Sequence, residues 1–428
     1  MATTATVTEQ LPIATTTPPA SARERGRIAG ADGVRALAAL MVIFHHLSQK
    51  LAPWGQTAWL QDVHGVLIKG ASGVSIFFVL SGMLLSYPFW TAYFLKKPHP
   101  AIGHYIKRRA QRILPGFYVA LGVSYVVAGT LARSDGYQIV HPLRRLIQGA
   151  TFTSEFTYTT FFPTDQDGPL WSIGFEVFCY VVMPLLMLGL FLLKFRGRIA
   201  GWTYWLAALA AMFLVNEWVT HVFITGADNK GWNFGIVGGA KIWMPDYNPV
   251  GMFLHFAMGI LAAGFIAMWK VFHAGRRSWW FDLVALAAFA GMATIFWVKR
   301  FPVELDNTFS LQHQPYFYPT FAGLTGVLLV GLAYSKVLGR AFDSPFMRYT
   351  AKISFGLDIW HHLIILWVGR VVSPEFLPYG GVTDPWRWLE ISAFTLVVSY
   401  VVAPLSWHII ERPFLEGWLS GKRRRVEG

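Results

Sequence analysis

The segment 34-VRALAALMVIFHHL-47 carries ionisable groups in an otherwise apolar run. Ten residues separate Arg35 from His46, and eleven helical steps turn through roughly three full circles plus 20°. Both side chains therefore lie on one helix face, about 16 Å apart along the axis, while His45 is rotated away by about 100°. Arginine suits phosphate groups, and an imidazole can accept a proton or carry an acyl group. The spacing could thus join an anion-binding site to a base.

Two other apolar segments carry buried ionisable residues. Glu176 lies in 170-LWSIGFEVFCYVVMPL-185, and Asp358 precedes His361 by three residues and His362 by four. Such spacings bring side chains together on a helix, and a carboxylate beside an imidazole fixes its tautomer. A charge at membrane depth costs several kcal/mol, which favours a functional role. The alternative for each group is structural, as a headgroup-facing arginine or a polar contact between helices.

The composition indicates that lipid is the solvent. Of 428 residues, 54% are hydrophobic and only 14% are charged, whereas soluble proteins carry about 25% charged residues. The single cysteine, Cys179, excludes a disulfide framework and a thiolate metal cage. No HExxH or CxxC spacing occurs, so we expect no metal.

Apolar segments near the roughly 20 residues that a bilayer requires recur along the chain. They predict an all-α, polytopic membrane protein with about ten transmembrane helices. Residues 31–415 form the membrane domain, preceded by a disordered cytoplasmic tail at 1–30 that has no signal-peptide core and followed by a basic cytoplasmic tail at 416–428. The predicted spans are 33–49, 65–88, 113–132, 170–193, 201–224, 249–269, 280–298, 316–335, 352–371 and 389–410.

Basic residues alternate between the connections. The N-terminal tail, every second connection and the C-terminal tail together hold 23 Lys and Arg residues, and the intervening connections hold nine. This pattern places both termini in the cytoplasm. The net charge of +13 therefore reflects topology, and we expect no nucleic-acid partner.

Six motifs occur in the order in which they occur in a known family. The sequence resembles acyltransferase family 3, multispanning membrane enzymes that acylate carbohydrates and lipids on the far side of the membrane. The match runs from Asp32 to Phe414. The motifs are 32-DGVRALAALMVIFHH-46, 77-FFVLSGMLL-85, 105-YIKRRAQRILPGFY-118, 169-PLWSIGFEVFCY-180, 353-ISFGLDIWHH-362 and 411-ERPF-414.

The resemblance implies roles for particular residues. The family's arginine–ten residues–histidine signature falls on Arg35 and His46, and its tryptophan–serine–glutamate motif falls on Trp171, Ser172 and Glu176. Its basic segment falls on Arg108, Arg109 and Arg112. The chain departs from the usual pattern at Val177, where many relatives have a second acidic residue, and at Asp358, where relatives often have an aromatic residue.

These residues suggest an O-acyltransferase of a bacterial inner membrane, using cytoplasmic acyl-CoA, with acetyl-CoA preferred. Acyl transfer needs an anchor for the anionic donor, a base and a group that stabilises the oxyanion. The expected donor anchors are Arg35, Lys107, Arg108, Arg109 and Arg112, and the expected catalytic residues are His46, Glu176, His361 and Asp358. His46 serves as general base or transient acyl carrier. A carbohydrate or glycolipid hydroxyl on the outer side meets Asp165, Asp167, Trp171 and Ser172 near the loop 161–171.

Two other functions use the same residues differently. A proton-coupled secondary transporter of a small charged solute could use the buried His and Glu, but the chain lacks the internal hydropathy repeat of such carriers. A noncatalytic scaffold would have no need of Arg35, His46 and Glu176.

Overall fold

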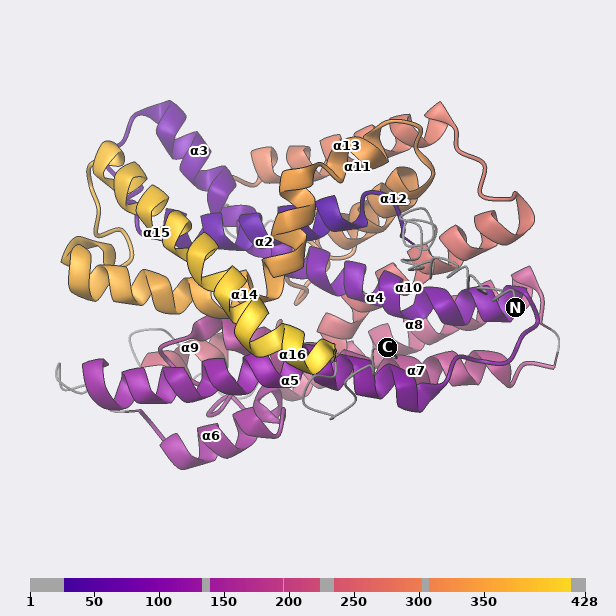
Figure 1. Cartoon of the computed structure of the whole chain (residues 1–428), viewed down its shortest axis with the longest axis horizontal. Coiled ribbons are helices and arrows are strands. Elements are labelled where there is room, and N and C mark those ends of the chain that lie inside the picture. Colours follow the sequence, from indigo (N-terminus) through magenta and orange to yellow (C-terminus); the bar gives the residue numbers. More distant parts are fainter. Residues whose placement is uncertain (1–26, 133–138, 195, 224–234, 302–307, 417–428) are drawn as a thin grey trace, which may run out of the picture.

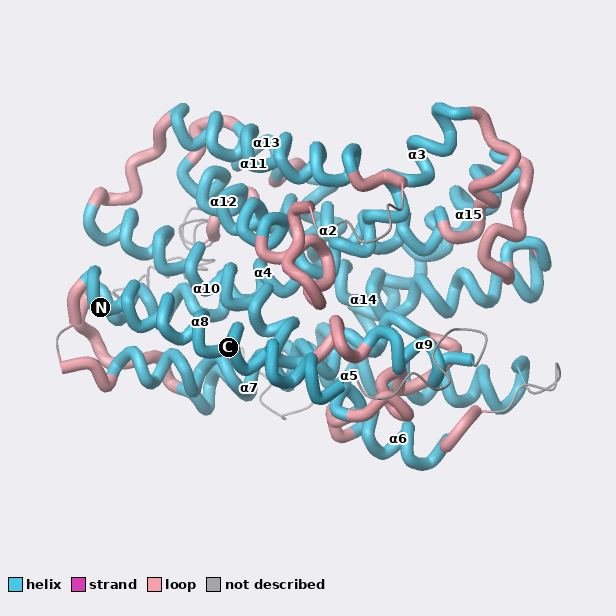
Figure 2. Tube along the Cα trace, turned by 180° about the vertical axis from the view of Figure 1, so that it is seen from behind, coloured by secondary structure: helices cyan, strands magenta, loops and turns pink. Residues whose placement is uncertain are grey.

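The computed structural model describes residues 27–132, 139–194, 196–223, 235–301 and 308–416. Within these ranges the chain forms helices and connecting loops without a β-strand (Figures 1 and 2). This confirms the predicted all-α class. Most of the two predicted tails, 1–26 and 417–428, lies outside the described residues.

The helices are α2 (Ala31–Ser48), α3 (Ala58–Ile68), α4 (Gly73–Phe94), α5 (Ile102–Val127), α6 (Pro142–Ala150), α7 (Trp171–Phe191), α8 (Arg198–Phe223), α9 (Gly235–Trp243), α10 (Pro249–Phe272), α11 (Trp279–Val298), α12 (Thr320–Tyr334), α13 (Leu338–Phe342), α14 (Pro345–Trp367), α15 (Pro385–Ser406) and α16 (Arg412–Leu415). Short 3₁₀ or π-helical turns extend or join them at η1 (Lys69–Ser72), η2 (Ala128–Ala132), η4 (Ser154–Phe156), η5 (Gly168–Leu170), η7 (Val368–Val372), η8 (Pro374–Phe376) and η9 (Trp407–Glu411).

Every predicted span corresponds to a helix. Eight helices or helical runs among the described residues are long and apolar enough to cross a membrane. The two other predicted spans are α2, with 18 residues, and α12, with 15. The chain is therefore a polytopic membrane protein.

Several boundaries differ from the prediction, most of all at α5 and at the helical run that contains α4. Helix α5 begins at Ile102, eleven residues before the predicted start, so the basic segment is helical instead of a loop. The predicted second span is part of a longer run, Ala58–Phe94, which bends at η1. At this bend Gly70 and Gly73 let the backbone approach α2 closely, because a Cβ at either position would lie within 2.6 Å of an α2 carbonyl oxygen.

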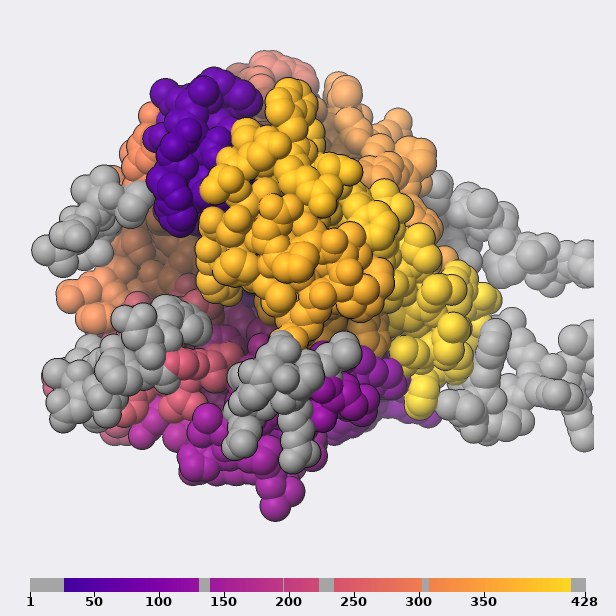
Figure 3. All heavy atoms as spheres, turned by 90° about the vertical axis from the view of Figure 1, so that its left-hand side faces the viewer, coloured from indigo at the N-terminus to yellow at the C-terminus, as the bar shows by residue number. Residues whose placement is uncertain are grey.

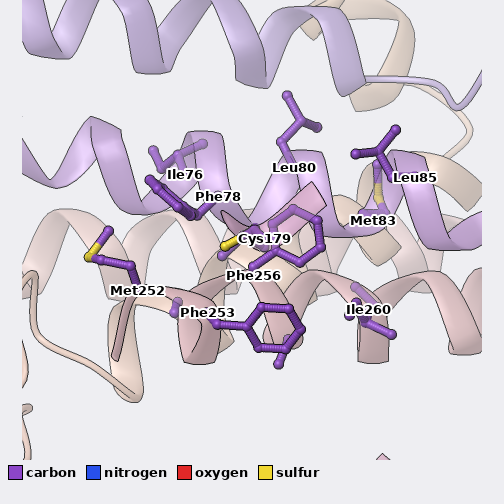
Figure 4. Close-up of a cluster of buried hydrophobic side chains, with 14 of the residues drawn as sticks. Ile76, Phe78, Leu80, Met83, Leu85, Cys179, Met252, Phe253, Phe256 and Ile260 are labelled. Carbon is purple, nitrogen blue, oxygen red and sulfur yellow. The ribbon is translucent and has the colours of Figure 1, made fainter. Parts of the chain in front are cut away.

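Helices α4 and α10 pack side by side and form the centre of the core. Two glycines permit this approach: a Cβ on Gly82 would lie 2.0 Å from the carbonyl oxygen of Phe256, and one on Gly259 would lie 1.8 Å from that of Val79. The indole N–H of Trp90 donates to the carbonyl of Ile260 at 2.9 Å. Large apolar side chains of both helices and Cys179 of α7 fill the surrounding space (Figure 4).

Helix α2 is anchored at both ends. The Asp343 carboxylate accepts hydrogen bonds from the backbone N–H groups of Gly30 and Gly33, both at 3.0 Å, which satisfies donors that a helix N-terminus leaves unpaired. The indole N–H of Trp388 donates to the carbonyl of Leu47 at 2.8 Å. Beyond Leu47, residues 50–52 pair with Val382, so the connection between α14 and α15 lies beside α3 at this end of the molecule (Figure 3).

Replacing Gly259 with Ala should separate α4 from α10, because the new methyl group meets backbone that cannot rotate away. We expect the free energy of unfolding to fall by on the order of 3 kcal/mol, as for an overpacked core. Thermal unfolding of the detergent-solubilised protein, followed by size-exclusion chromatography, measures the loss. Gly122→Ala is the matched control, since a Cβ there meets nothing within 4 Å. Equal melting temperatures for the two variants would contradict the close packing of these helices.

Candidate active site

Three imidazoles meet where α2 packs against α14. The ring centroid of His46 lies 5.1 Å from that of His361 and 5.3 Å from that of His362. His45 is 4.9 Å from His46 on the other side, and its Nδ1 lies 2.6 Å from the carbonyl oxygen of Ile68. Both His361 and His362 of α14 therefore contact His46. The sequence spacing alone did not show which of the two would do so.

Main-chain carbonyls fix the tautomers of the two α14 histidines. Nδ1 of His362 donates to the carbonyl of Gln166 at 3.1 Å. Nδ1 of His361 lies 2.9 Å from the carbonyl oxygen of Leu357 and 2.8 Å from that of Asp358. A carbonyl only accepts, so each Nδ1 carries a proton and each neutral ring keeps a lone pair on Nε2.

The expected contact between the Asp358 carboxylate and His361 is not observed. Asp358 bonds this ring through its main-chain oxygen, and its side chain lines a cavity one helical turn away. A helical residue three positions before a histidine presents its carbonyl to that side chain, which accounts for the difference.

The cavity lies between α2, α4, α5, α7 and α14 and is partly open to solvent. It brings together six residues predicted from the sequence: Arg35, Arg109, Arg112, Ser172, Glu176 and Asp358. Ser81, Tyr180 and Ser354 supply further polar groups, and phenylalanine and leucine side chains supply most of the rest. Arg35 of α2 therefore lines a cavity whose other walls are formed by α4, α5, α7 and α14.

The positive charges of this cavity are not neutralised by ion pairs. Over the described ranges of the chain, no carboxylate lies within ion-pair distance of Arg35, Arg109 or Arg112. The guanidinium of Arg109 lies 6.0 Å from the centre of the Tyr180 ring. Three guanidinium groups face one cavity, which Glu176 and Asp358 also line, and each guanidinium offers several donors to an oxyanion.

The Glu176 carboxylate is held at one oxygen only. Ser81 donates to Oε1 at 3.1 Å, and the Tyr180 hydroxyl donates to the same oxygen. Oε2 receives no hydrogen bond from the described part of the protein, so it can accept one from a molecule in the cavity.

Three predicted residues lie elsewhere. Lys107 and Arg108 are exposed on another face of α5 and do not line the cavity. Trp171 is buried in an aromatic cluster, with its ring 5.6 Å from that of Phe161 and 5.2 Å from that of Phe175. Trp171 therefore packs the start of α7 instead of facing the cavity.

In the loop that precedes α7, Asp165 is partly buried and Asp167 is fully buried. Asp165 forms an ion pair with Arg145, whose guanidinium also donates to the carbonyl of Phe162 at 2.7 and 2.8 Å. Asp167 is fully buried, and neither carboxylate oxygen has a hydrogen-bond partner among the described residues. Burial raises the pKa of Asp167 well above its ordinary value, and the negative charge of Asp358 raises it further.

Sequence reasoning missed four polar residues of this region: Gln49, Ser81, Tyr180 and Ser354. Tyr180 follows Glu176 by four residues, a spacing that could have revealed their contact. Gln49 follows His45 by four residues and His46 by three, so spacing could have revealed these contacts as well. Ser81 and Ser354 face a partner or a cavity formed by other helices, which one sequence does not reveal. Among the residues that the structure describes, no group of three or more His, Cys, Asp or Glu side chains is arranged to hold a metal ion.

These features define a class of protein: a multispanning membrane protein in which one helix carries an arginine that lines a cavity and a histidine that lies in a cluster of imidazoles. The acyltransferase domain model of acyltransferase family 3 matches residues 28–404. The chain therefore belongs to this family, as the motifs predicted, and is a membrane acyltransferase.

Curated relatives match over most of the chain at low identity. Nodulation protein 10 of Rhizobium leguminosarum bv. viciae is 23% identical over 95% of this chain and 99% of its own length. O-acetyltransferase OatA of Staphylococcus aureus (strain NCTC 8325 / PS 47) is 23% identical over 90% of this chain. The match covers 56% of OatA, so the chain spans just over half of that relative. No solved structure matches the chain.

Asp167→Asn should stabilise the protein in a pH-dependent way. Because the folded-state pKa of Asp167 is raised, the unfolded chain loses this proton at a lower pH than the folded chain. The carboxyl therefore lowers stability as the pH rises above about 3.9, by up to about 1.4 kcal/mol per pH unit until its folded pKa is reached.

We expect Asp167→Asn to raise the melting temperature at pH 7, with a gain that shrinks toward pH 4. Asp384→Asn is the control, since that carboxylate is exposed at the start of α15 and accepts from the N–H of Trp386. A gain at pH 4 equal to that at pH 7 would show that Asp167 is charged in the folded protein.

Proposed function

We propose that this acyltransferase moves an acetyl group from cytoplasmic acetyl-CoA to a hydroxyl of an envelope or extracellular glycan. The observation that carries the proposal is the arrangement of α2, which bears Arg35 in the cationic cavity and His46 in the imidazole cluster. Ten residues lie between them, and the eleven helical steps span about 16 Å, roughly half the thickness of a bilayer.

The cationic cavity suits the charged end of the donor. Coenzyme A carries phosphate groups, and guanidinium groups bind phosphate through paired hydrogen bonds. Arg35, Arg109 and Arg112 have no protein carboxylate as a competing partner in the described chain, so a phosphate does not have to displace one. The flexible arm of the donor then extends along α2 and carries the thioester to His46.

His46 acts as the general base. Nε2 of His46 takes the proton of the acceptor hydroxyl while the hydroxyl oxygen bonds to the thioester carbonyl carbon. The tetrahedral intermediate collapses, the carbon–sulfur bond breaks, and the coenzyme A sulfur leaves with the electron pair. The imidazolium returns its proton to this sulfur, so His46 and the free thiol are restored. His361 and His362 border His46 and can donate to the developing oxyanion only when protonated.

Glu176 orients the acceptor. Ser172 and Glu176 are four residues apart on α7, and both line the cavity. With Oε1 already bonded to Ser81 and Tyr180, Oε2 accepts a hydrogen bond from an acceptor hydroxyl. The acceptor approaches from the side of the 161–171 loop, whose last residue, Trp171, begins α7 and precedes Ser172.

The comparisons support the choice of an acetyl group, and the glycan acceptor is chosen from the family resemblance. One relative is named an O-acetyltransferase, and the family model is an acyltransferase domain. A multispanning enzyme with its basic connections on the cytoplasmic side can take the donor from the cytoplasm and reach an acceptor outside. We assign the protein to a bacterial inner membrane on this basis.

Inverted membrane vesicles supplied with labelled acetyl-CoA test the donor. His46→Ala should lower kcat by about 10²- to 10⁴-fold, the usual contribution of a general base. Arg35→Ala and Arg112→Ala should mainly raise the KM for acetyl-CoA, since they remove contacts made to the bound donor. Arg277→Ala removes an exposed charge between α10 and α11 and serves as the control. Full activity of His46→Ala would remove this residue from catalysis, and an unchanged KM in both arginine variants would refute the donor site.

Mass spectrometry of envelope glycans tests the acceptor. Cells that lack the gene should lose one acetyl ester, and the wild-type gene should restore it. The His46→Ala gene, expressed to the same level in the membrane, should not restore the ester. Identical ester content in all three strains would contradict an envelope glycan as acceptor.

A further inference from the structure

A chain of hydrogen bonds connects the carbonyl of Ile68, at the end of α3, to His46 through His45 and Gln49. Nδ1 of His45 lies 2.6 Å from the carbonyl oxygen of Ile68. Nε2 of His45 lies 3.1 Å from Nε2 of Gln49, and Oε1 of Gln49 lies 3.1 Å from Nδ1 of His46. Gln49 thus bridges two adjacent imidazoles from its position at the C-terminal end of α2.

Each hydrogen bond in this chain has one allowed direction. The Ile68 carbonyl can only accept, so Nδ1 of His45 carries the proton and Nε2 of the neutral ring accepts from the Gln49 amide. With its N–H group turned to His45, the amide presents its oxygen to His46. An amide oxygen can only accept, so Nδ1 of His46 donates and Nε2 keeps its lone pair.

We propose that Gln49 is a positioning residue that holds His46 in the tautomer whose Nε2 accepts the proton of the acyl acceptor. The proposal rests on the general-base role of His46 given above. Gln49 touches neither donor nor acceptor and acts through the ring that it orients. The amide oxygen remains a suitable acceptor after His46 is protonated, because Nδ1 carries a proton in both states.

Gln49 is itself fixed before it orients His46. Its backbone N–H donates to the carbonyl of His45 at 3.1 Å, and its carbonyl accepts from Gly380 at 2.8 Å. The side chain is therefore supported by α2 on one side and by the connection between α14 and α15 on the other. A second-sphere partner held in this way can set ring orientation as carboxylates do in other enzymes.

No carboxylate takes this role. The groups that face His46 are His45 and Gln49 from α2 and its end, and His361 and His362 from α14. Over the described residues, no Asp or Glu lies within ion-pair distance of His46. A neutral amide thus supplies the acceptor that a carboxylate supplies in a catalytic triad.

Two substitutions at Gln49 separate positioning from folding. Gln49→Met keeps the side-chain length and removes the acceptor, so kcat should fall by about 10- to 100-fold, as for other second-sphere partners. The KM for acetyl-CoA should stay unchanged, because the arginine cavity is intact. Gln49→Glu keeps an acceptor for His46 but loses the N–H group that donates to Nε2 of His45, so it should recover part of the activity.

The pH profile supplies the readout that a structural role does not move. A carboxylate at position 49 stabilises the imidazolium, so a higher pH is needed to free the base. The acid limb of the kcat profile should therefore move to higher pH in Gln49→Glu relative to wild type. Gln61→Ala is the matched control, since this glutamine lies on α3 and donates to the carbonyl of Gln56. Its kcat and pH profile should equal those of wild type.

The outcomes distinguish this inference from the proposed function. Wild-type kcat for Gln49→Met, with His46→Ala inactive, would overturn the role of Gln49 and leave the function standing. Equal losses of kcat in Gln49→Met and Gln49→Glu, with the acid limb of the pH profile unshifted, would also overturn the role of Gln49 and leave the function standing. Absence of acetyl transfer by the wild type would overturn the function, and this inference with it. Membrane content and size-exclusion elution verify folding, and if Gln49→Met fails to fold, the acid limb of Gln49→Glu decides alone.

Discussion

The solvation of three guanidinium groups is the constraint on which the rest of the structure depends. Arg35, Arg109 and Arg112 come from two helices of an apolar bundle, and taking such charges out of water costs several kcal/mol each. In the described chain no carboxylate pairs with them, so water or an anionic ligand must solvate them. The helices around α2 and α5 therefore enclose a solvent-connected cavity instead of closing on a dry core. Dense packing is confined to places such as the α4–α10 contact.

Helix α2 relates this cavity to the imidazole cluster. Its N-terminus is fixed by Asp343 and its C-terminal end by Trp388, so neither end can shift without losing hydrogen bonds. Close contacts at Gly70 and Gly73 hold the middle of the helix against the bend before α4. Because the helix is rigid between these points, the separation of Arg35 and His46 is set by helical rise alone. The fold thus converts a sequence spacing into a fixed distance.

Composition and helical periodicity predicted much of this protein. The spans were predictable because lipid requires long apolar helices, and Arg35, Glu176 and Asp358 were predictable because charges in such helices are rare. The sequence did not reveal which face of α5 turns inward, since Lys107, Arg108, Arg109 and Arg112 all belong to one basic run. Only the packing of α5 against α7 and α14 separates the inward pair from the exposed pair. The Arg145–Asp165 pair depends on loop conformation, which periodicity does not describe, whereas the contacts of Gln49 with His45 and His46 follow helical spacing.

The two ends of the site differ in how their polar groups are satisfied, and the difference matches the chemistry proposed for them. At the cavity, the guanidinium groups form no ion pair with the described residues, which leaves them able to bind an anionic donor. At the imidazole cluster, carbonyl and amide oxygens of Ile68, Gln49, Gln166 and Leu357 hold every Nδ1 proton. A carboxylate there would favour the imidazolium and occupy the base with a proton before the substrate arrived. Neutral acceptors fix the same tautomer without that charge. The Nε2 lone pairs of His46, His361 and His362 therefore stay available in a region where an additional ion would be costly, while that of His45 accepts from Gln49.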